Sequence, residues 1–234
     1  MLAAFRLMLG PALLWQGRRV RKNILRLPEP PGPRQGTTGN GHPMSLLILG
    51  DSSAAGVGAP DQADALSGQL IPRLAERFEV AWTLHAQTGW TTQEALEALP
   101  KVDGQKFDAA IISLGVNDVT TETGLNRWLQ IYGTLLERLS TDNGISKFVL
   151  SGLPPMGRFP ALPQPLRWYL GKQATSHDRA LGEMAAARQD AIHLPLNFGN
   201  MDESAVAEDG FHPGPIVYAR WAVEMDKAIH DFIG

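Results

Sequence analysis

The 234-residue chain contains no cysteine, which excludes disulfide bonds and thiolate chemistry. It also lacks an uninterrupted apolar run of about 20 residues, the length that a helix needs to cross a lipid bilayer. Gly56-Val57-Gly58 starts like a dinucleotide-binding loop, but Asp61 stands where the third glycine belongs, and no Gly-Lys-Ser/Thr follows. Neither dinucleotide binding nor a phosphate loop is therefore expected.

The charge is unevenly distributed along the chain. Residues 1–43 carry seven Lys or Arg against one acid, Glu29, whereas the remainder carries 14 bases and 23 acids. Because the excess of bases is confined to this arm, nucleic-acid binding is not expected. We divide the chain into an arm, residues 1–43, whose Leu27–Pro43 segment is a linker rich in proline and glycine, and one globular domain, residues 44–234.

The arm begins with an apolar stretch, Leu7–Trp15, followed by four bases at positions 18, 19, 21 and 22. A secretory signal has its bases before the apolar stretch, so we expect no signal peptide and a cytoplasmic location. Two roles for residues 1–24 stay open. They contact a membrane peripherally, with the arginines on anionic head groups, or they form a helix that packs on the acidic body. In the first case the side chains entering lipid are Leu2, Phe5, Leu9, Leu13 and Leu14.

From residue 45 onward, short apolar runs alternate with longer amphipathic ones. Thr91-Thr92-Gln93-Glu94 has the spacing of a capping box, and Asn143-Gly144 is expected to end a helix. This alternation predicts an α/β fold with five parallel strands between two layers of helices. The expected strands are Ser45–Leu49, Val80–His85, Asp108–Leu114, Lys147–Ser151 and Ile192–Leu196. The expected helices are Asp64–Phe78, Thr91–Leu99, Trp128–Leu139, Trp168–Arg188 and Pro215–Ile233.

Chemically useful residues follow the predicted strands. Ser52 comes directly after the first strand, Gly89 after the second and Asn117 after the third. Asp209 and His212 precede the last helix. Since the carboxyl ends of parallel strands share one edge of the sheet, these loops should meet in space.

Serine, histidine and aspartate together predict an acyl-transfer site. A serine hydroxyl needs a base to remove its proton, and His212 is the candidate base for Ser52. Asp209 is close enough in sequence to accept the second imidazole N–H. The candidate oxyanion donors are the Ser52 backbone N–H, the Gly89 N–H and the Asn117 amide. No metal or other cofactor is required; Asp226 and His230 share a helix face, but no third ligand accompanies them.

The set Gly50-Asp51-Ser52, Gly89, Gly115-Val116-Asn117-Asp118 and Asp209-Gly210-Phe211-His212 resembles the SGNH hydrolase superfamily, the Gly-Asp-Ser type of esterases and lipases. Its order and spacing match from residue 45 to the end of the chain. The resemblance implies a flavodoxin-like three-layer sandwich, Ser52 as nucleophile, Asp209 and His212 as its triad partners, and Gly89 and Asn117 as oxyanion donors. Residues 1–43 lie outside it.

The same residues also suit simpler roles. Ser52 and Ser53 both suit a helix cap, and Ser53 is the rival nucleophile. The Gly-x-Ser-x-Gly elbow of other serine esterases is absent, because Ala54 stands at the second glycine position. Asp51 is expected to form the turn, and Asp118 to be structural.

The segment Leu153–Trp168 combines five prolines with large apolar side chains. It follows the fourth strand, so it is expected either to line an acyl pocket or to be buried against neighbouring helices. The candidate pocket residues are Trp90, Met156, Phe159 and Leu162.

These patterns predict a serine carboxylesterase acting on short- to medium-chain acyl esters through an acyl-enzyme. The alternatives are an acyltransferase, a thioesterase or a carbohydrate acetylesterase using the same site, and a non-catalytic membrane-associated module. The expected partner is a small ester substrate.

Overall fold

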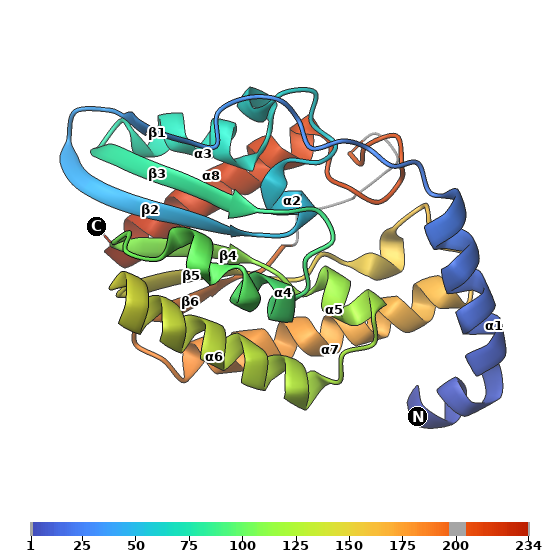
Figure 1. Ribbon diagram of the computed structural model, residues 1–234. Helices are drawn as coiled ribbons and strands as arrows, with labels where there is room; N and C mark the ends of the chain where they lie inside the picture. The colour runs from blue at the N-terminus through green and yellow to red at the C-terminus, as the bar shows by residue number, and fades with distance from the viewer. Residues whose placement is uncertain (1, 197–204, 234) are drawn as a thin grey trace.

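A single mixed β-sheet forms the centre of the molecule (Figure 1). The computed structural model describes residues 2–196 and 205–233, with side chains from residue 9 onward. The six strands run in the order β1-β3-β2-β4-β5-β6, with β1 antiparallel to β3 and all other neighbours parallel. They are β1 (Gln35–Thr38), β2 (His42–Gly50), β3 (Phe78–Ala86), β4 (Ala109–Ser113), β5 (Lys147–Ser151) and β6 (Ala191–Leu194).

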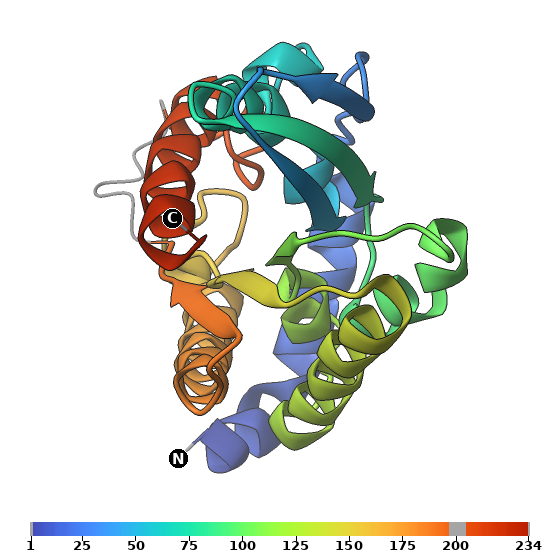
Figure 2. The same cartoon turned by 90° about the vertical axis from the view of Figure 1, so that its left-hand side faces the viewer.

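Helices cover both faces of the sheet, giving three layers (Figure 2). Helices α3 and α8 pack on one face, and α4, α6 and α7 pack on the other. The α-helices are α1 (Leu2–Asn23), α2 (Ser52–Ala55), α3 (Leu66–Leu74), α4 (Thr92–Glu97), α5 (Val116–Thr120), α6 (Leu125–Asn143), α7 (Leu166–Ala186) and α8 (Pro215–Ile233). Within the described residues, the short 3-10 helices are η1 (Gln62–Asp64), η2 (Leu99–Val102) and η3 (Met156–Arg158).

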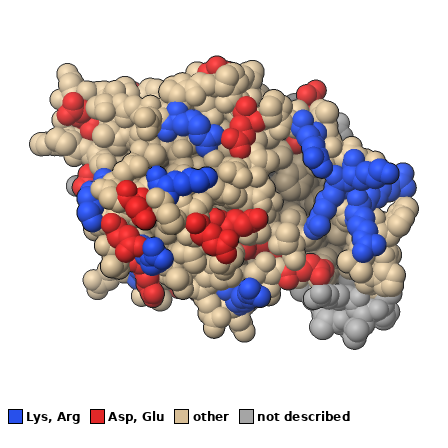
Figure 3. All heavy atoms as spheres, in the orientation of Figure 1, with Lys and Arg blue, Asp and Glu red and all other residues tan. Residues whose placement is uncertain are grey.

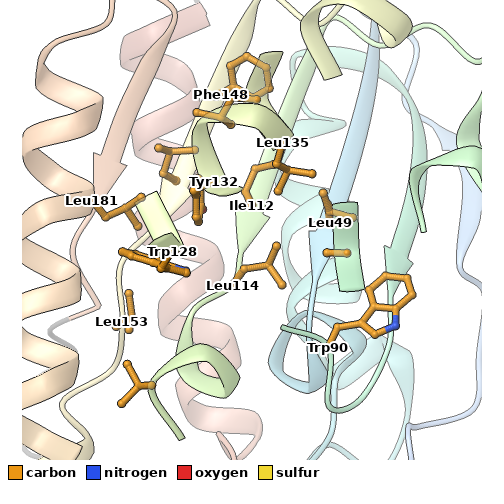
Figure 4. Packing of buried hydrophobic residues seen from close by; sticks show 14 of the residues in the cluster. Leu49, Trp90, Ile112, Leu114, Trp128, Tyr132, Leu135, Phe148, Leu153 and Leu181 are labelled. Carbon is orange, nitrogen blue, oxygen red and sulfur yellow. The ribbon is translucent and has the colours of Figure 1, made fainter. Parts of the chain in front are cut away.

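The apolar run of β2 explains why this strand is central. Leu46 and Ile48 point into the core beneath α3 and α8, while Leu47 and Leu49 point into the core beneath α4 and α6. All four are fully buried, as expected for a strand covered on both sides. Figure 4 shows the second of these cores, where the ring of Trp128 lies beside Tyr132 and Leu153.

The predicted fold class is confirmed, and so are several local signals. The five parallel strands have the flavodoxin-like order, because β2 pairs with β3 on one side and β4 on the other. Thr91 and Glu94 form the predicted capping box. Helix α6 ends at Gly144, whose φ of 74° is left-handed.

The predicted strand count was wrong by one. Strand β1 lies in the segment expected to be a linker and pairs its Gln35–Thr38 with residues 80–83 of β3. All four of its residues are exposed, so they carry no alternation between buried and exposed positions. This strand is held at the edge of the sheet by backbone hydrogen bonds. Such bonds do not depend on side-chain type, so no sequence pattern predicts them.

Helix α1 lies beyond the carboxyl ends of the parallel strands, at the right of Figure 1. Its Leu13 is buried against the body, whereas Leu14 and Trp15 are exposed. The side chains of Leu2 and Phe5, which were expected to enter lipid, fall outside the described residues. None of the described helices combines the length and apolar character needed to span a membrane.

Candidate active site

The turn after β2 places Ser52 at the carboxyl edge of the sheet. Asp51 ends the strand and caps α2 by accepting the backbone N–H of Ser53 at 3.0 Å, so Ser52 becomes the first residue of the helix. A Cβ on Gly50 would lie 2.5 Å from the Ser113 carbonyl oxygen, so only glycine fits the end of β2 beside its neighbour β4. The cap and the close packing at Gly50 therefore fix the position of Ser52.

Ser52, His212 and Asp209 form a continuous chain of hydrogen bonds. The Ser52 Oγ lies 2.8 Å from His212 Nε2, and His212 Nδ1 lies 2.5 Å from Asp209 Oδ2. Ser52 and His212 are 160 positions apart in the sequence. This arrangement is suited to removing the serine proton while the carboxylate orients the imidazole.

The loop carrying the histidine is held in shape by Asp209 itself. The second carboxylate oxygen, Oδ1, accepts the backbone N–H groups of Phe211 and His212 at 2.9 and 3.0 Å. Burial alone would raise the pKa of Asp209, but the hydrogen bonds from the His212 side chain and from these backbone groups outweigh burial and hold the pKa below its usual value. Asp209 is therefore a carboxylate that can stabilise a protonated imidazole.

The two other candidate oxyanion donors face the same cleft. Gly89 has a φ of 89°, and nothing lies within 4 Å of the position that a Cβ would take. Asn117 is the second residue of α5, and its Nδ2 donates to the Trp90 carbonyl at 2.9 Å. Ser52 follows β2 and Asn117 follows β4, so the two lie on either side of the point where the strand order reverses, the usual ligand site of this fold.

Asp51 and Asp118 are buried acids beneath the site. Asp118 accepts the backbone N–H and the hydroxyl of Thr92 at 3.0 and 2.9 Å, and this hydroxyl accepts the indole N–H of Trp128. These bonds tie α4, α5 and α6 together, in line with the structural role expected for Asp118. Burial raises the pKa of Asp118, and it raises the pKa of Asp51 to about 6.

Glu29 is a residue at the site that sequence reasoning missed. Its Oε1 accepts both the backbone N–H and the hydroxyl of Thr88, at 2.7 and 2.8 Å, in the residue that precedes Gly89. Its Oε2 accepts from Arg34 at 2.8 Å, and Arg34 also donates to the Ala86 carbonyl. As the only acid of the basic arm, Glu29 stood out in composition, but no local pattern connects it with a loop 59 positions away.

The predicted pocket residues divide into two groups. Leu162 lines the cleft above Ser52, and Phe159 packs edge-on against Phe211, with ring centroids 5.0 Å apart. Trp90 and Met156 lie in the core, and Figure 4 shows Trp90 beside Leu49. The Trp90 ring stands edge-on to His85, with ring centroids 5.1 Å apart. The large apolar side chains of the proline-rich segment, apart from Trp168, are therefore buried, and the segment supports the histidine loop through the two phenylalanine rings.

The open space above these groups is a cleft of about 730 Å³, within the usual range for small-molecule sites. Ser52, Gly89, Asn117 and His212 lie on its floor. Side chains of α1, α5 and α7 form its walls. The structure thus brings Ser52 and His212, together with the oxyanion candidates Gly89 and Asn117, to one solvent-accessible space.

The chain is similar in sequence to proteins of one known family. The model of the GDSL-like Lipase/Acylhydrolase family matches residues 48–220. The GDSL-like esterase Rv1075c of Mycobacterium tuberculosis is 30% identical over 205 residues, which cover 80% of this chain and 62% of that protein. The chain thus matches less than two thirds of this relative's length.

Solved structures show the same fold at low sequence identity. The structure of TesA has a TM-score of 0.64 at 22% identity, covering 80% of this chain and 99% of that one. The psychrotrophic esterase EstA from Pseudoalteromonas sp., solved with monoethylphosphonate as inhibitor, has a TM-score of 0.60 at 20% identity, covering 81% and 98%. These likenesses support the fold alone.

Proposed function

The chain belongs to the GDSL-like lipase/acylhydrolase family, and from this we propose that it is a serine carboxylesterase that hydrolyses short- to medium-chain acyl esters through an acyl-enzyme. The observation that carries the proposal is the hydrogen-bonded chain from Ser52 through His212 to Asp209 on the floor of an open cleft. Esterase names among the relatives support the same reaction class.

In the proposed reaction, Ser52 Oγ attacks the ester carbonyl carbon while His212 Nε2 takes the hydroxyl proton. The carbonyl oxygen becomes an oxyanion that accepts hydrogen bonds from Gly89 N–H, Asn117 Nδ2 and Ser52 N–H. The C–O bond to the alcohol then breaks, and His212 returns the proton to the departing alkoxide. Water, deprotonated by His212, attacks the acyl-enzyme, and the acid leaves as Ser52 regains its proton.

The test is hydrolysis of p-nitrophenyl esters from acetate to decanoate by the native protein, Ser52→Ala and Ser53→Ala. Ser52→Ala should lose at least about 10³-fold in kcat, because the nucleophile is gone. Ser53→Ala is the matched control and should stay within about tenfold of the native rate. Native rates in Ser52→Ala would contradict the proposal. A loss of activity confined to Ser53→Ala would identify Ser53 as the nucleophile.

Transfer to an alcohol differs from hydrolysis only in the acceptor. With methanol added to the ester assay, a hydrolase releases mainly free acid, whereas an acyltransferase releases mainly methyl ester. We expect free acid, since the cleft is open to water.

We also propose that the outer side of α1 contacts an anionic membrane surface. Trp15 is 59% exposed, and the guanidinium of Arg19 lies 5.3 Å from its ring centroid. Lys22 and, just after the helix, Arg26 are exposed as well. Figure 3 shows Lys and Arg side chains gathered at the right-hand end of the molecule, over α1. A tryptophan among exposed bases is typical of segments that lie on anionic lipid.

A further inference from the structure

The cleft above Ser52 has one wall that lies outside the family match. Helix α1 ends at residue 23, whereas the match begins at residue 48. Leu13, Gly17, Val20 and Ile24 nevertheless line the same space as Ser52 and His212. The space open to the substrate therefore depends on an element that the family core does not include.

This wall is attached to the body by specific contacts. Gln16 donates from Nε2 to the Gln164 carbonyl at 2.8 Å and accepts the Leu166 N–H at 3.1 Å, just at the start of α7. Arg21 donates to the Thr120 carbonyl at 2.7 Å, at the end of α5. Leu13, only 5% exposed, packs in the core formed with α7. Helix α1 thus spans from α7 to α5 across the cleft.

One face of α1, continued by Ile24 directly after the helix, lines the cleft with an apolar stripe; Arg18 and Arg21, outside this stripe, also line the cleft. Positions 13, 17, 20 and 24 follow the i, i+4, i+7, i+11 spacing of one helix face. The same cleft is also lined by Leu162, Leu166 and Leu170, all buried, from the proline-rich segment and α7. Apolar side chains on two walls of one cleft favour the binding of a hydrocarbon chain between them, because the bound chain is removed from water.

We propose that the apolar stripe of α1 and the leucines of α7 together bind the acyl chain of the substrate, so that the enzyme prefers medium-length apolar acyl esters over acetate. The inference rests on the proposed function and adds the substrate class. Each CH₂ that enters the cleft can raise kcat/KM by up to about fourfold, until the space is filled. Preference for chain length is therefore set largely by an element outside the family core.

Gly17 provides a direct test. It lies in the middle of the stripe, and nothing is within 4 Å of where its Cβ would stand, so a larger side chain there would occupy the cleft itself. Leucine is also a better helix former than glycine, so Gly17→Leu should not weaken α1. Gly133, in the middle of α6 and equally uncrowded, gives the matched control Gly133→Leu.

The measurement is kcat/KM for p-nitrophenyl acetate, butyrate, octanoate and decanoate, with the melting temperature of each variant. Gly17→Leu should lower kcat/KM for decanoate at least tenfold and for acetate less than twofold, and Gly17→Ala should fall between it and the native protein. Gly133→Leu should keep the native chain-length profile.

The failures of the two proposals are distinguishable. Absence of Ser52-dependent hydrolysis for every ester would overturn the proposed function. Ser52-dependent hydrolysis with the same chain-length profile in Gly17→Leu as in the native protein would overturn the acyl-wall proposal alone. Equal loss for acetate and decanoate in a Gly17→Leu variant that melts at the native temperature would also overturn it. If Gly17→Leu melts early, the profile of Gly17→Ala decides by the same criteria.

Discussion

Asp209 holds the histidine loop and orients its imidazole with one carboxylate. One oxygen accepts two backbone N–H groups, and the other accepts from His212 Nδ1. Removing the charge while keeping the shape should separate these two tasks. An amide at this position can still accept the backbone bonds, but it cannot stabilise an imidazolium.

Asp209→Asn is therefore expected to lower kcat by about 10²–10⁴-fold with a small change in melting temperature. Steady-state kinetics on p-nitrophenyl butyrate and a thermal melt give the two values. A variant with native kcat would show that Asp209 does not assist His212.

Glu29 is expected to position the Gly89 loop rather than to touch the substrate. Glu29→Ala frees Thr88 and should lower kcat by about tenfold with little change in KM, because a displaced oxyanion donor weakens transition-state binding. Glu29→Gln keeps an acceptor oxygen and should recover part of the loss. Glu79→Ala, an exposed acid near the amino end of β3, is the control and should match the native enzyme. A native kcat in Glu29→Ala would show that Glu29 does not position the Gly89 loop.

At the scale of elements, α1 has two different sides. Its inner side lines the cleft, and its outer side exposes Trp15, Arg19 and Lys22. The two uses that the sequence left open, packing on the body and contact with lipid, therefore fall on different faces of one helix. Burial of Leu13 settles the packing, while the lipid contact stays a proposal.

Flotation with liposomes tests the outer side of α1. The native protein should float with vesicles that contain phosphatidylglycerol, and less with phosphatidylcholine alone, because each base near an anionic surface contributes about 1 kcal/mol. Arg19→Ala/Lys22→Ala should reduce recovery several-fold. The charge-matched control Arg127→Ala/Lys172→Ala, on exposed bases of α6 and α7, should float like the native protein. Equal recovery for both double variants would contradict the contact.

At the scale of the whole molecule, Asp51 links stability to pH. Burial is the main reason that its pKa is about 6 in the folded state, against 3.8 for an exposed carboxyl. The folded protein therefore binds this proton more tightly than the unfolded chain does. By linkage, this contribution to stability is fully present below about pH 4 and is lost as pH rises to about 6.

Asp51→Asn keeps an oxygen that can accept the Ser53 N–H but removes the buried charge. The variant should gain free energy of unfolding relative to the native protein as pH rises from about 4 to 6, by about 3 kcal/mol at most. Urea denaturation at intervals between pH 4 and pH 7 gives the difference directly. A difference that is constant over this range would show that Asp51 does not titrate there.

Much of the fold could be predicted because buried strands and helix faces require apolar residues at regular positions in the sequence. The apolar runs of β2, β4 and β5 indicate strands covered on both faces, and the bounds of α8 follow from Pro215 and the periodicity behind it. Strand β1 could not be found, since its exposed residues join the sheet through backbone atoms that every residue carries. His193 likewise pairs with Asp178 at 2.9 Å, although nothing in its neighbourhood along the chain indicated a partner.

The sequence by itself determined the α/β class, the turn that presents Ser52 and the residues assembled around it, because strand burial, glycine turns and residue spacing are written locally. Only the tertiary structure decided that Glu29 holds the Gly89 loop, that Trp90 and Met156 belong to the core, and that α1 closes one side of the cleft. These depend on how segments distant along the chain pack in space, and such contacts leave no pattern in either segment alone.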